Sequence, residues 1–289
     1  MDERLFHQLT QWLSAEAVVL ATVIATRGAT PRKGGSRMLI AATRSAASVG
    51  GGLAESRVID AARALLGRDG DIDQLRIDLS GKPGAAGVCG GSMQIALRRW
   101  SGAADRDRAQ RIAAALAEGR RVALPASAIG SSREEWLVPN PRLLIVGAGH
   151  CAAALCDLAQ FLDYNLWVYD ERPDCFNSNS FTAVHRVDGA VVSLRQAFDT
   201  QRRMLVVLLN RDFASDVATL SAIAGLPSHF LGMMGSQKRI AEVLAAVPDQ
   251  PDLAARLRAP VGIDIHAQTP HEIAVGILAQ LIQAQSAIR

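Results

Sequence analysis

The sequence LLIVGAGHCA, residues 143–152, decides the fold of the second half of the chain. Four β-prone apolar residues run directly into a G-x-G-x-x-A motif, and a helix-forming segment follows. Gly147 permits a tight turn, Gly149 lets the backbone approach a pyrophosphate, and Ala152 is small enough for a helix to pack closely on the strand. This order of strand, glycine-rich turn and helix predicts a Rossmann fold.

The same turn supplies a candidate site for a dinucleotide. Asp170 ends the next predicted strand, 21 residues after Gly149, where a carboxylate can bind ribose hydroxyls. The helix N-terminus offers free N–H groups to a phosphate. We therefore predict NAD as a ligand, and NADP stays open because Arg172 follows closely. The alternative is a retained fold with an empty site. The candidate residues are Gly147, Gly149, His150 and Asp170.

Strands and helices alternate from residue 142 to the end of the sequence. Such alternation is typical of a parallel, doubly wound sheet. Proline, glycine and serine break any periodicity over residues 125–141, so we predict a linker there. Residues 1–124 then form a mixed α/β domain, and residues 142–289 form a Rossmann-like domain. The predicted strands of the second domain are residues 143–146, 166–170, 204–209, 229–232 and 261–263.

Composition excludes several classes of protein. Of the 289 residues, 49% are hydrophobic and 20% charged, which is typical of a globular chain with a packed core. A net charge of +3 is too small to indicate binding to nucleic acid. The first ten residues lack the apolar region of a signal peptide, and the apolar runs are shorter than a membrane span. We therefore expect a cytoplasmic protein without a nucleic-acid or membrane partner.

The four cysteines follow no tight metal-binding spacing, and in a chain with no export signal we expect reduced thiols. Cys151 shares the predicted helix N-terminus with His150. The helix dipole is expected to lower the pKa of the Cys151 thiol. Cys156 is interpreted as a core residue.

Four cations lie among three glycines in the loop TRGATPRKGGSR, residues 26–37. Arginine presents a fork of donors that matches phosphate or an oxyanion, and glycine lets backbone N–H groups approach the same anion. We predict a cradle for phosphate or an oxo-metal group, and the alternative is a solvated loop whose charges serve solubility. The candidate residues are Arg27, Arg32, Lys33, Gly34, Gly35 and Arg37.

Two further glycine-rich loops carry candidate contacts. Gly51 and Gly52 precede a predicted helix and can form a backbone anion site, or a plain turn in which Glu55 favours the helix dipole. Cys89 lies beside Gly90 and Gly91, where a bulky ligand can reach it. A thiolate is a soft ligand suited to molybdenum or to carrying sulfur. The alternative is a small buried residue at Cys89.

These loops, in this order and followed by a Rossmann segment, resemble the xanthine dehydrogenase accessory protein family, XdhC/CoxI. The resemblance covers nearly the whole chain. The matching segments are ATRGATPR at 25–32, GGSRM at 34–38, VGGG at 49–52, VCGG at 88–91, GAGH at 147–150, Gly232, Gly235 with Ser236, GIDI at 262–265 and TPHEIA at 269–274.

The resemblance implies a carrier rather than an enzyme. Members of this family bind molybdenum cofactor, protect it during sulfuration by a cysteine desulfurase, and deliver it to the molybdenum subunit of xanthine dehydrogenase or a related hydroxylase. It also implies a homodimer, with residues 1–124 as the cofactor-handling domain. The expected cofactor contacts are Arg27, Arg32, Lys33, Gly34, Gly35, Arg37, Gly51, Gly52, Cys89, Gly90 and Gly91, with Cys89 as the candidate molybdenum contact.

The sequence departs from the family pattern in the second half. Asn210 stands where a Thr-His pair is usual, and His266 stands where glycine is usual. Asp264 and His266 form an Asp-x-His pair without an evident third metal ligand. Two alternatives to a carrier stay open: an NAD(P)-dependent oxidoreductase that uses the Rossmann half, and an enzyme that transfers sulfur to the cofactor through Cys89.

Overall fold

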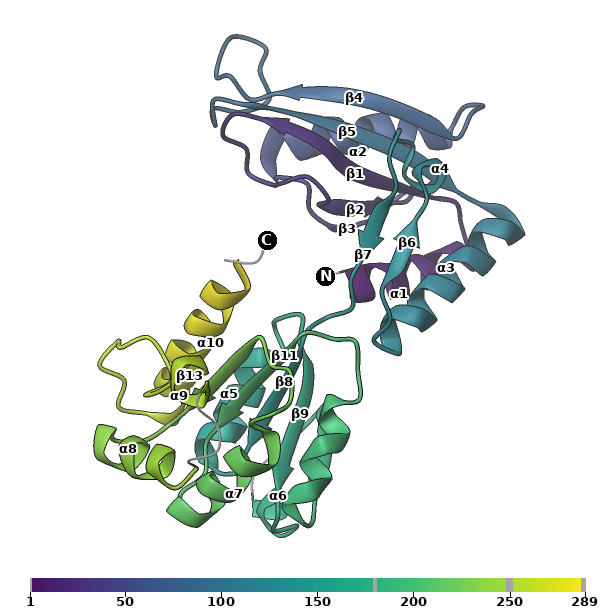
Figure 1. The fold of residues 1–289 in the computed structure, drawn as a ribbon. Coiled ribbons are helices and arrows are strands. Elements are labelled where there is room, and N and C mark those ends of the chain that lie inside the picture. Colours follow the sequence, from purple (N-terminus) through teal and green to yellow (C-terminus); the bar gives the residue numbers. More distant parts are fainter. Residues whose placement is uncertain (1, 179–180, 248–251, 287–289) are drawn as a thin grey trace. The chain divides into compact units, whose positions relative to one another are not determined.

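The computed structural model describes residues 2–178, 181–247 and 252–286. The chain divides into two compact units, Met1–Pro139 and Asn140–Arg289 (Figure 1). Each unit has a sheet of its own with helices on both faces. Among the described residues, none of the helices combines the length and the hydrophobicity needed to cross a lipid bilayer.

The first unit is built on an antiparallel sheet in the order β3-β2-β1-β5-β4. The central strand β1 is a run of β-branched and small apolar residues and is buried from Val18 to Val23, because both faces of the sheet are covered. The strands are β1 (Val18–Arg27), β2 (Arg37–Ile40), β3 (Ser45–Ala47), β4 (Ile72–Asp78) and β5 (Ser92–Trp100).

Helix α2 (Gly52–Leu66) covers one face of this sheet through Val58, Ala62 and Leu65, which recur at helical spacing. Helices α1 (Asp2–Leu13) and α3 (Gly102–Ala117) cover the other face. Phe6 of α1 is fully buried and meets Trp100 edge to face, at 6.1 Å between ring centroids. The helices thus bury both faces of the sheet, and the loops discussed below lie at its ends.

Residues 125–139 form elements of the first unit, whereas we predicted a linker over 125–141. They contain α4 (Ala126–Ile129) and β7 (Glu135–Leu137), which pairs with β6 (Val122–Leu124). Ile129 and Leu137 are fully buried in the first unit's core. The proline and glycine that suggested a linker instead bound a short helix, with Pro125 before it and Gly130 after it at a positive φ of 80°.

The second unit contains a parallel sheet in the order β10-β9-β8-β11-β12-β13, as predicted from the alternating pattern. This is the 3-2-1-4-5-6 order of a Rossmann fold, and its switch point lies between β8 and β11. The strands are β8 (Arg142–Val146), β9 (Asn165–Asp170), β10 (His185–Asp188), β11 (Met204–Leu208), β12 (Phe230–Met233) and β13 (Leu257–Arg258).

Helices pack on both faces of the parallel sheet. On one face, α5 and α10 share a core with β8, and on the other, η1, α7 and α8 share a core with β11. Their bounds are α5 (His150–Ala159), α6 (Cys175–Ser178), the 3-10 helix η1 (Val191–Phe198), α7 (Phe213–Ile223), α8 (Gln237–Ala245), α9 (Leu253–Arg256) and α10 (Pro270–Ser286).

The prediction of a last strand at residues 261–263 is wrong. The edge strand β13 lies earlier, at Leu257–Arg258. Pro260 lacks an N–H group for the ladder. The N–H of Val261 still donates to the carbonyl of Met233 in β12, but Gly262 adopts a φ of 105° and the backbone leaves the sheet there.

Candidate functional site

The first and third glycine-rich loops of the first unit touch at one end of its sheet. A Cβ added at Gly28 would lie 3.1 Å from Cα of Gly91 and 3.2 Å from the carbonyl oxygen of Gly90. A Cβ at Gly91 would clash with the carbonyl oxygens of Arg27 and Ala29. Glycine at these positions therefore allows two backbones, about sixty residues apart in the sequence, to lie against each other.

The second loop joins this cluster through Gly50. A Cβ there would lie 2.8 Å from Cγ of Pro31, in the first loop. Glu55 of α2 accepts hydrogen bonds from the hydroxyl of Ser48 at 2.5 Å and from the N–H of Gly51 at 3.1 Å. The Glu55 carboxylate thus occupies one of the donors predicted for an anion. We name the three converging segments, residues 26–36, 48–52 and 87–91, the loop cluster.

Three cations of the loop cluster project into solvent. Arg27, Arg32 and Lys33 are exposed, and their side chains have no ion pair or hydrogen bond with any residue that the structure describes. Arginine and lysine without carboxylate partners keep their full capacity for an external anion. These three residues fit the predicted cradle for phosphate or an oxo-metal group.

Arg37 differs from these cations, although the sequence predicts it as part of the same cradle. Its side chain is only 5% exposed. It donates to Asp2 at 2.9 Å, to the carbonyl oxygen of Gly35 at 3.0 Å, and to Glu135. Two carboxylates neutralise the buried guanidinium. Arg37 therefore anchors the end of the first loop to α1 and β7, and does not present its charge to a ligand.

The glycines of the loop cluster fall into two groups. At Gly51, Gly52 and Gly90 an added Cβ would meet nothing within 4 Å, so these backbones face open space. Gly35 has a φ of 84°, and its N–H donates to the carbonyl of Val23 at 2.8 Å, so it serves the turn. Gly34 is exposed beside it.

Cys89 is exposed, and Val88 beside it is 87% exposed. The buried alternative for Cys89 is therefore wrong. The thiol lies in the same loop as Gly90 and Gly91, and this loop contacts the loop that carries the unpaired cations. The cluster thus combines a soft sulfur atom, free cations and open backbone in one place.

In the second unit, the glycine-rich turn has the predicted geometry. Gly147 has a φ of 99°, and an added Cβ would lie 3.0 Å from the backbone of Leu209, so only glycine lets the ends of β8 and β11 approach this closely. Gly149 precedes α5 in extended conformation. Ala152 is fully buried under the helix, as expected for the small third position.

Arg211 lies over this turn. Its guanidinium would be 3.6 Å from a Cβ at Gly149, and its Nη2 is 2.9 Å from Nδ1 of His150. Arginine carries only donors, so Nδ1 of His150 is the acceptor in this contact. Arg211 was missed by the sequence reasoning, although its position directly after β11, the neighbour of β8, could have indicated it.

Asp170 is placed as predicted at the end of β9, but its carboxylate is already engaged. It is 4% exposed and accepts from the N–H of Ala148 at 2.8 Å and from the backbone and guanidinium of Arg172 at 3.0 to 3.1 Å. Burial acts to raise the pKa of Asp170, but the hydrogen bonds from Arg172 and Ala148 outweigh it and hold the pKa below its ordinary value. These bonds fill the acceptor positions that ribose hydroxyls would use.

A buried ion pair fixes the loop that carries Arg211. Arg239 of α8 donates to Asp216 and to the carbonyl oxygens of Arg211 at 3.0 Å, Asp212 at 2.8 Å and Asn210 at 3.2 Å. Burial raises the pKa of Asp216, against the hydrogen bonds from Arg239 and Asn210. Three successive carbonyls held by one guanidinium leave little freedom to the β11–α7 loop. Asn210, a departure from the family pattern, donates to Asp216 at 3.1 Å and belongs to this network.

Both thiols of α5 have a pKa above that of an ordinary cysteine. Burial raises the pKa of Cys151 and outweighs the opposing charge of Arg211, so the expected lowering by the helix dipole is wrong. Cys156 is fully buried, as interpreted, and burial raises its pKa to about 12. Neither thiol has the acidity of a nucleophile at neutral pH.

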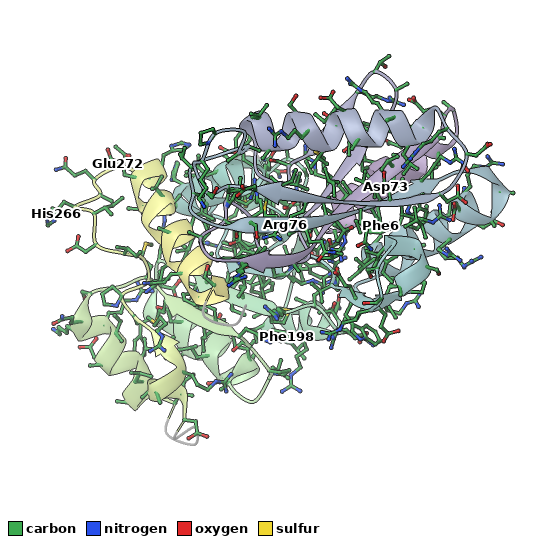
Figure 2. The ribbon with its side chains drawn as sticks, turned by 90° about the horizontal axis from the view of Figure 1, so that it is seen from above. Phe6, Asp73, Arg76, Phe198, His266 and Glu272 are labelled. Carbon is green, nitrogen blue, oxygen red and sulfur yellow. The ribbon has the colours of Figure 1, made fainter. Side chains whose placement is uncertain are left out.

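The conformation of the loop before α10 explains why glycine is usual at the position of His266. His266 has a φ of 56°, a left-handed conformation in which glycine is the unstrained residue. His266 is 95% and Asp264 83% exposed. Figure 2 shows His266 on the loop before α10 and Glu272 in the first turn of the helix. Glu272 accepts from the N–H groups of Gln268 and Thr269, which caps the helix. Within the described part of the chain, no three His, Cys, Asp or Glu side chains gather as a metal site.

Comparisons with known proteins agree with this architecture. Residues 143–281 match the model of the XdhC Rossmann domain, and residues 11–78 match the model of the XdhC and CoxI family. The crystal structure described as a xanthine dehydrogenase from Bacillus halodurans has the same fold, with a TM-score of 0.83 over 100% of this chain and 96% of that chain at 22% identity.

Two curated relatives are longer than this chain. Uncharacterized protein YqeB of Escherichia coli strain K12 is 25% identical over 276 residues, which cover 92% of this chain and 43% of that protein. A protein of Bacillus subtilis strain 168 that is named as a probable xanthine dehydrogenase subunit is 26% identical over 151 residues, which cover 52% of this chain and 44% of that protein. This chain spans less than half the length of either relative.

Proposed function

Because the chain belongs to the XdhC and CoxI family, we propose that it is an accessory protein that binds molybdenum cofactor and delivers it to apo xanthine dehydrogenase or a related molybdenum hydroxylase. The name of the Bacillus subtilis relative supports the link to xanthine dehydrogenase. In this proposal the chain is a stoichiometric carrier, not an enzyme, and protects its cargo while a cysteine desulfurase supplies sulfur. A homodimer would present two such sites.

The loop cluster is the observation that carries the proposal. Molybdenum cofactor is a pterin with a terminal phosphate and an oxo or sulfido metal. Arg27, Arg32 and Lys33 offer unpaired donors for the phosphate, and Gly51, Gly52 and Gly90 leave backbone open to a bulky group. The exposed thiol of Cys89 supplies a soft atom for the metal. The residues present therefore fit such cargo in charge, space and ligand chemistry.

The test is retention of the cargo. The purified full chain is incubated with molybdenum cofactor and separated by gel filtration, and bound molybdenum and pterin are measured per chain. We expect nearly one equivalent of each. Cys89→Ala should lose molybdenum, and a double variant with Arg32→Gln and Lys33→Gln should lose the pterin as well, because its phosphate has no counter-charge.

The matched control is Arg211→Gln, which removes an exposed cation from the other unit and should retain the cargo fully. Retention by Cys89→Ala equal to that of the unchanged protein, together with full reconstitution of the apo-enzyme, would contradict the assignment of Cys89. Loss of retention in Arg211→Gln alone would move the site to the second unit.

The Rossmann unit supports a second candidate, binding of NAD(P) for an oxidoreductase. The glycine-rich turn and the strand order favour it. The engaged carboxylate of Asp170 counts against ribose recognition, because a hydroxyl must displace Arg172. Titration of the full chain with NADH and NADPH, followed by nicotinamide fluorescence, tests this candidate. Saturable binding of NADH that is lost in Asp170→Ala would support it, and no binding of either nucleotide would remove it.

A further inference from the structure

A second hollow of the Rossmann unit lies away from its glycine-rich turn. A cavity of about 620 Å³ opens at the amino ends of β12 and β13, beside the last turns of α10. The glycine-rich turn follows the carboxyl end of β8, so the two lie at opposite ends of the parallel sheet. A volume of this size is in the range of pockets that bind small molecules.

The walls of the cavity present donors. Arg256 donates to the carbonyls of Ala224 and Leu226 and to the hydroxyl of Ser228, so its positive charge is fixed at the cavity wall. Arg258, on the edge strand, is exposed and has no ion pair or hydrogen bond from its side chain to any described residue. One guanidinium is therefore structural, and the other is free to bind a ligand.

The opposite wall adds an amide of fixed orientation. Gln280 of α10 accepts from the N–H of Gly262 at 2.8 Å through its Oε1. Because that partner is a donor, the amide NH₂ of Gln280 is left for other contacts. Gln283 lies almost one turn further along the same helix and lines the cavity as well.

The charged side chains that line the cavity are positive. Among the described residues, its lining includes two arginines and no aspartate or glutamate. His229 also lines it, and burial together with the nearby charge of Arg203 lowers the pKa of His229. Phe230, Leu231 and Ala284 supply an apolar surface within the same cavity. A cation-lined hollow with an apolar floor has the chemistry to hold an anion that carries a hydrophobic body.

We propose that this cavity binds a small organic anion, with its carboxylate or phosphate monoester on Arg258 and Gln280 and its apolar body against Phe230 and Ala284. The site is distinct from the loop cluster and from the glycine-rich turn. Both oxyanions match the guanidinium fork, and the titration below separates them.

The test is isothermal titration of the full chain with four probes: phenyl phosphate, benzoate, inorganic phosphate and phenol. Phenyl phosphate or benzoate should bind saturably, and the tighter of the two identifies the oxyanion. Inorganic phosphate and phenol should each bind more weakly, since each lacks half of the recognised chemistry. Arg258→Gln should weaken binding of the organic anion about tenfold, because a charge-assisted hydrogen bond is lost. Arg258 is exposed on a short edge strand, so this variant is expected to fold.

Lys238→Gln is the matched control, because it removes one exposed cation elsewhere in the same unit and should bind the organic anion as the unchanged protein does. Ala284→Leu reduces the space in the cavity and should weaken the organic anion more than inorganic phosphate. Equal affinity of Arg258→Gln and the unchanged protein would overturn the proposal. The absence of saturable binding by both organic probes would overturn it as well.

Discussion

Glycine-rich loops lie at the end of a sheet in both units, but their charges are arranged differently. In the loop cluster, Arg27, Arg32 and Lys33 have no acidic partner among the described residues, and the open glycines border solvent. Around the glycine-rich turn of the second unit, Arg172 is paired with Asp170, and Arg211 is hydrogen-bonded to His150. The first arrangement leaves its donors available to an external anion, whereas the second is largely satisfied within the protein. A glycine-rich motif alone therefore does not reveal whether its site is free to bind.

The largest effect is expected from Gly91→Ala, which tests how tightly the loop cluster is packed. The new Cβ would meet the carbonyl oxygens of Arg27 and Ala29, which are backbone atoms in a paired strand and its adjoining loop and cannot rotate away. We expect the free energy of unfolding of the first unit to fall by about 3 kcal/mol. Urea unfolding followed by tryptophan fluorescence measures this change.

The control for that variant is Gly90→Ala. Gly90 also has a positive φ, 86°, but an added Cβ meets nothing within 4 Å. Gly90→Ala should therefore lower the free energy of unfolding by only about 1 kcal/mol, because alanine must adopt a left-handed conformation. Equal losses of stability at both positions would show that the losses come from backbone strain at the substituted residue and not from the contact between the loops.

The next effect concerns the network that fixes Arg211 in the second unit. Arg239→Met leaves Asp216 buried without its cation and three carbonyl oxygens without their donor. We expect the free energy of unfolding of the second unit to fall by about 2 kcal/mol, less than is usual for a broken buried pair, because Asp216 can take up a proton. Lys238→Met, which changes the neighbouring and 86% exposed cation, should stay within about 0.5 kcal/mol. A similar loss in both would mean that the buried pair contributes little.

A smaller effect with a definite pH dependence is expected at Asp170. Its pKa is lowered in the folded chain, so the ionised carboxylate stabilises the fold at pH values above its unfolded pKa of about 3.9. This contribution is lost as the pH falls through the lower, folded pKa. At pH 7, Asp170→Asn should therefore lower the free energy of unfolding by about 1 kcal/mol. The expected loss is this small because Arg172 is 62% exposed and solvent screens the ion pair. The difference should close in acid, and a difference that grows below pH 4 would contradict the assignment.

The sequence predicts the second unit well because its signals are local. The apolar run, the glycines and Ala152 lie within about ten residues, and periodicity over that length fixes strand, turn and helix. The linker prediction is wrong because Pro125 and Gly130 also bound a short helix, and only the burial of Ile129 and Leu137 distinguishes the two cases. The strand predicted at 261–263 is absent for a related reason. Val261 and Ile263 are β-prone, but Pro260 and the positive φ of Gly262 prevent a continuous strand.

The roles of the charged site residues depend on partners that are distant in the sequence. Arg37 and Arg32 lie in one loop, yet Arg37 is buried because Asp2 and Glu135 come from elements 35 residues before it and 98 residues after it. Asp170 is engaged in part by the N–H of Ala148, 22 residues before it, although its other partner, Arg172, is only two residues away. The local sequence around Arg32 and Arg37 does not show which of the two is paired with a carboxylate and which is available to a ligand.

The smallest effect on stability is expected where the proposed function needs the largest effect on binding. The double variant with Arg32→Gln and Lys33→Gln removes two exposed charges that contact no described acid, so its free energy of unfolding should change by less than about 0.5 kcal/mol. Its retention of molybdenum cofactor should nevertheless fall sharply. Arg37→Gln should show the reverse order, with a clear loss of stability from two unpaired carboxylates. If the double variant lost stability and kept its cargo, the two kinds of cation in this loop would have been assigned the wrong way round.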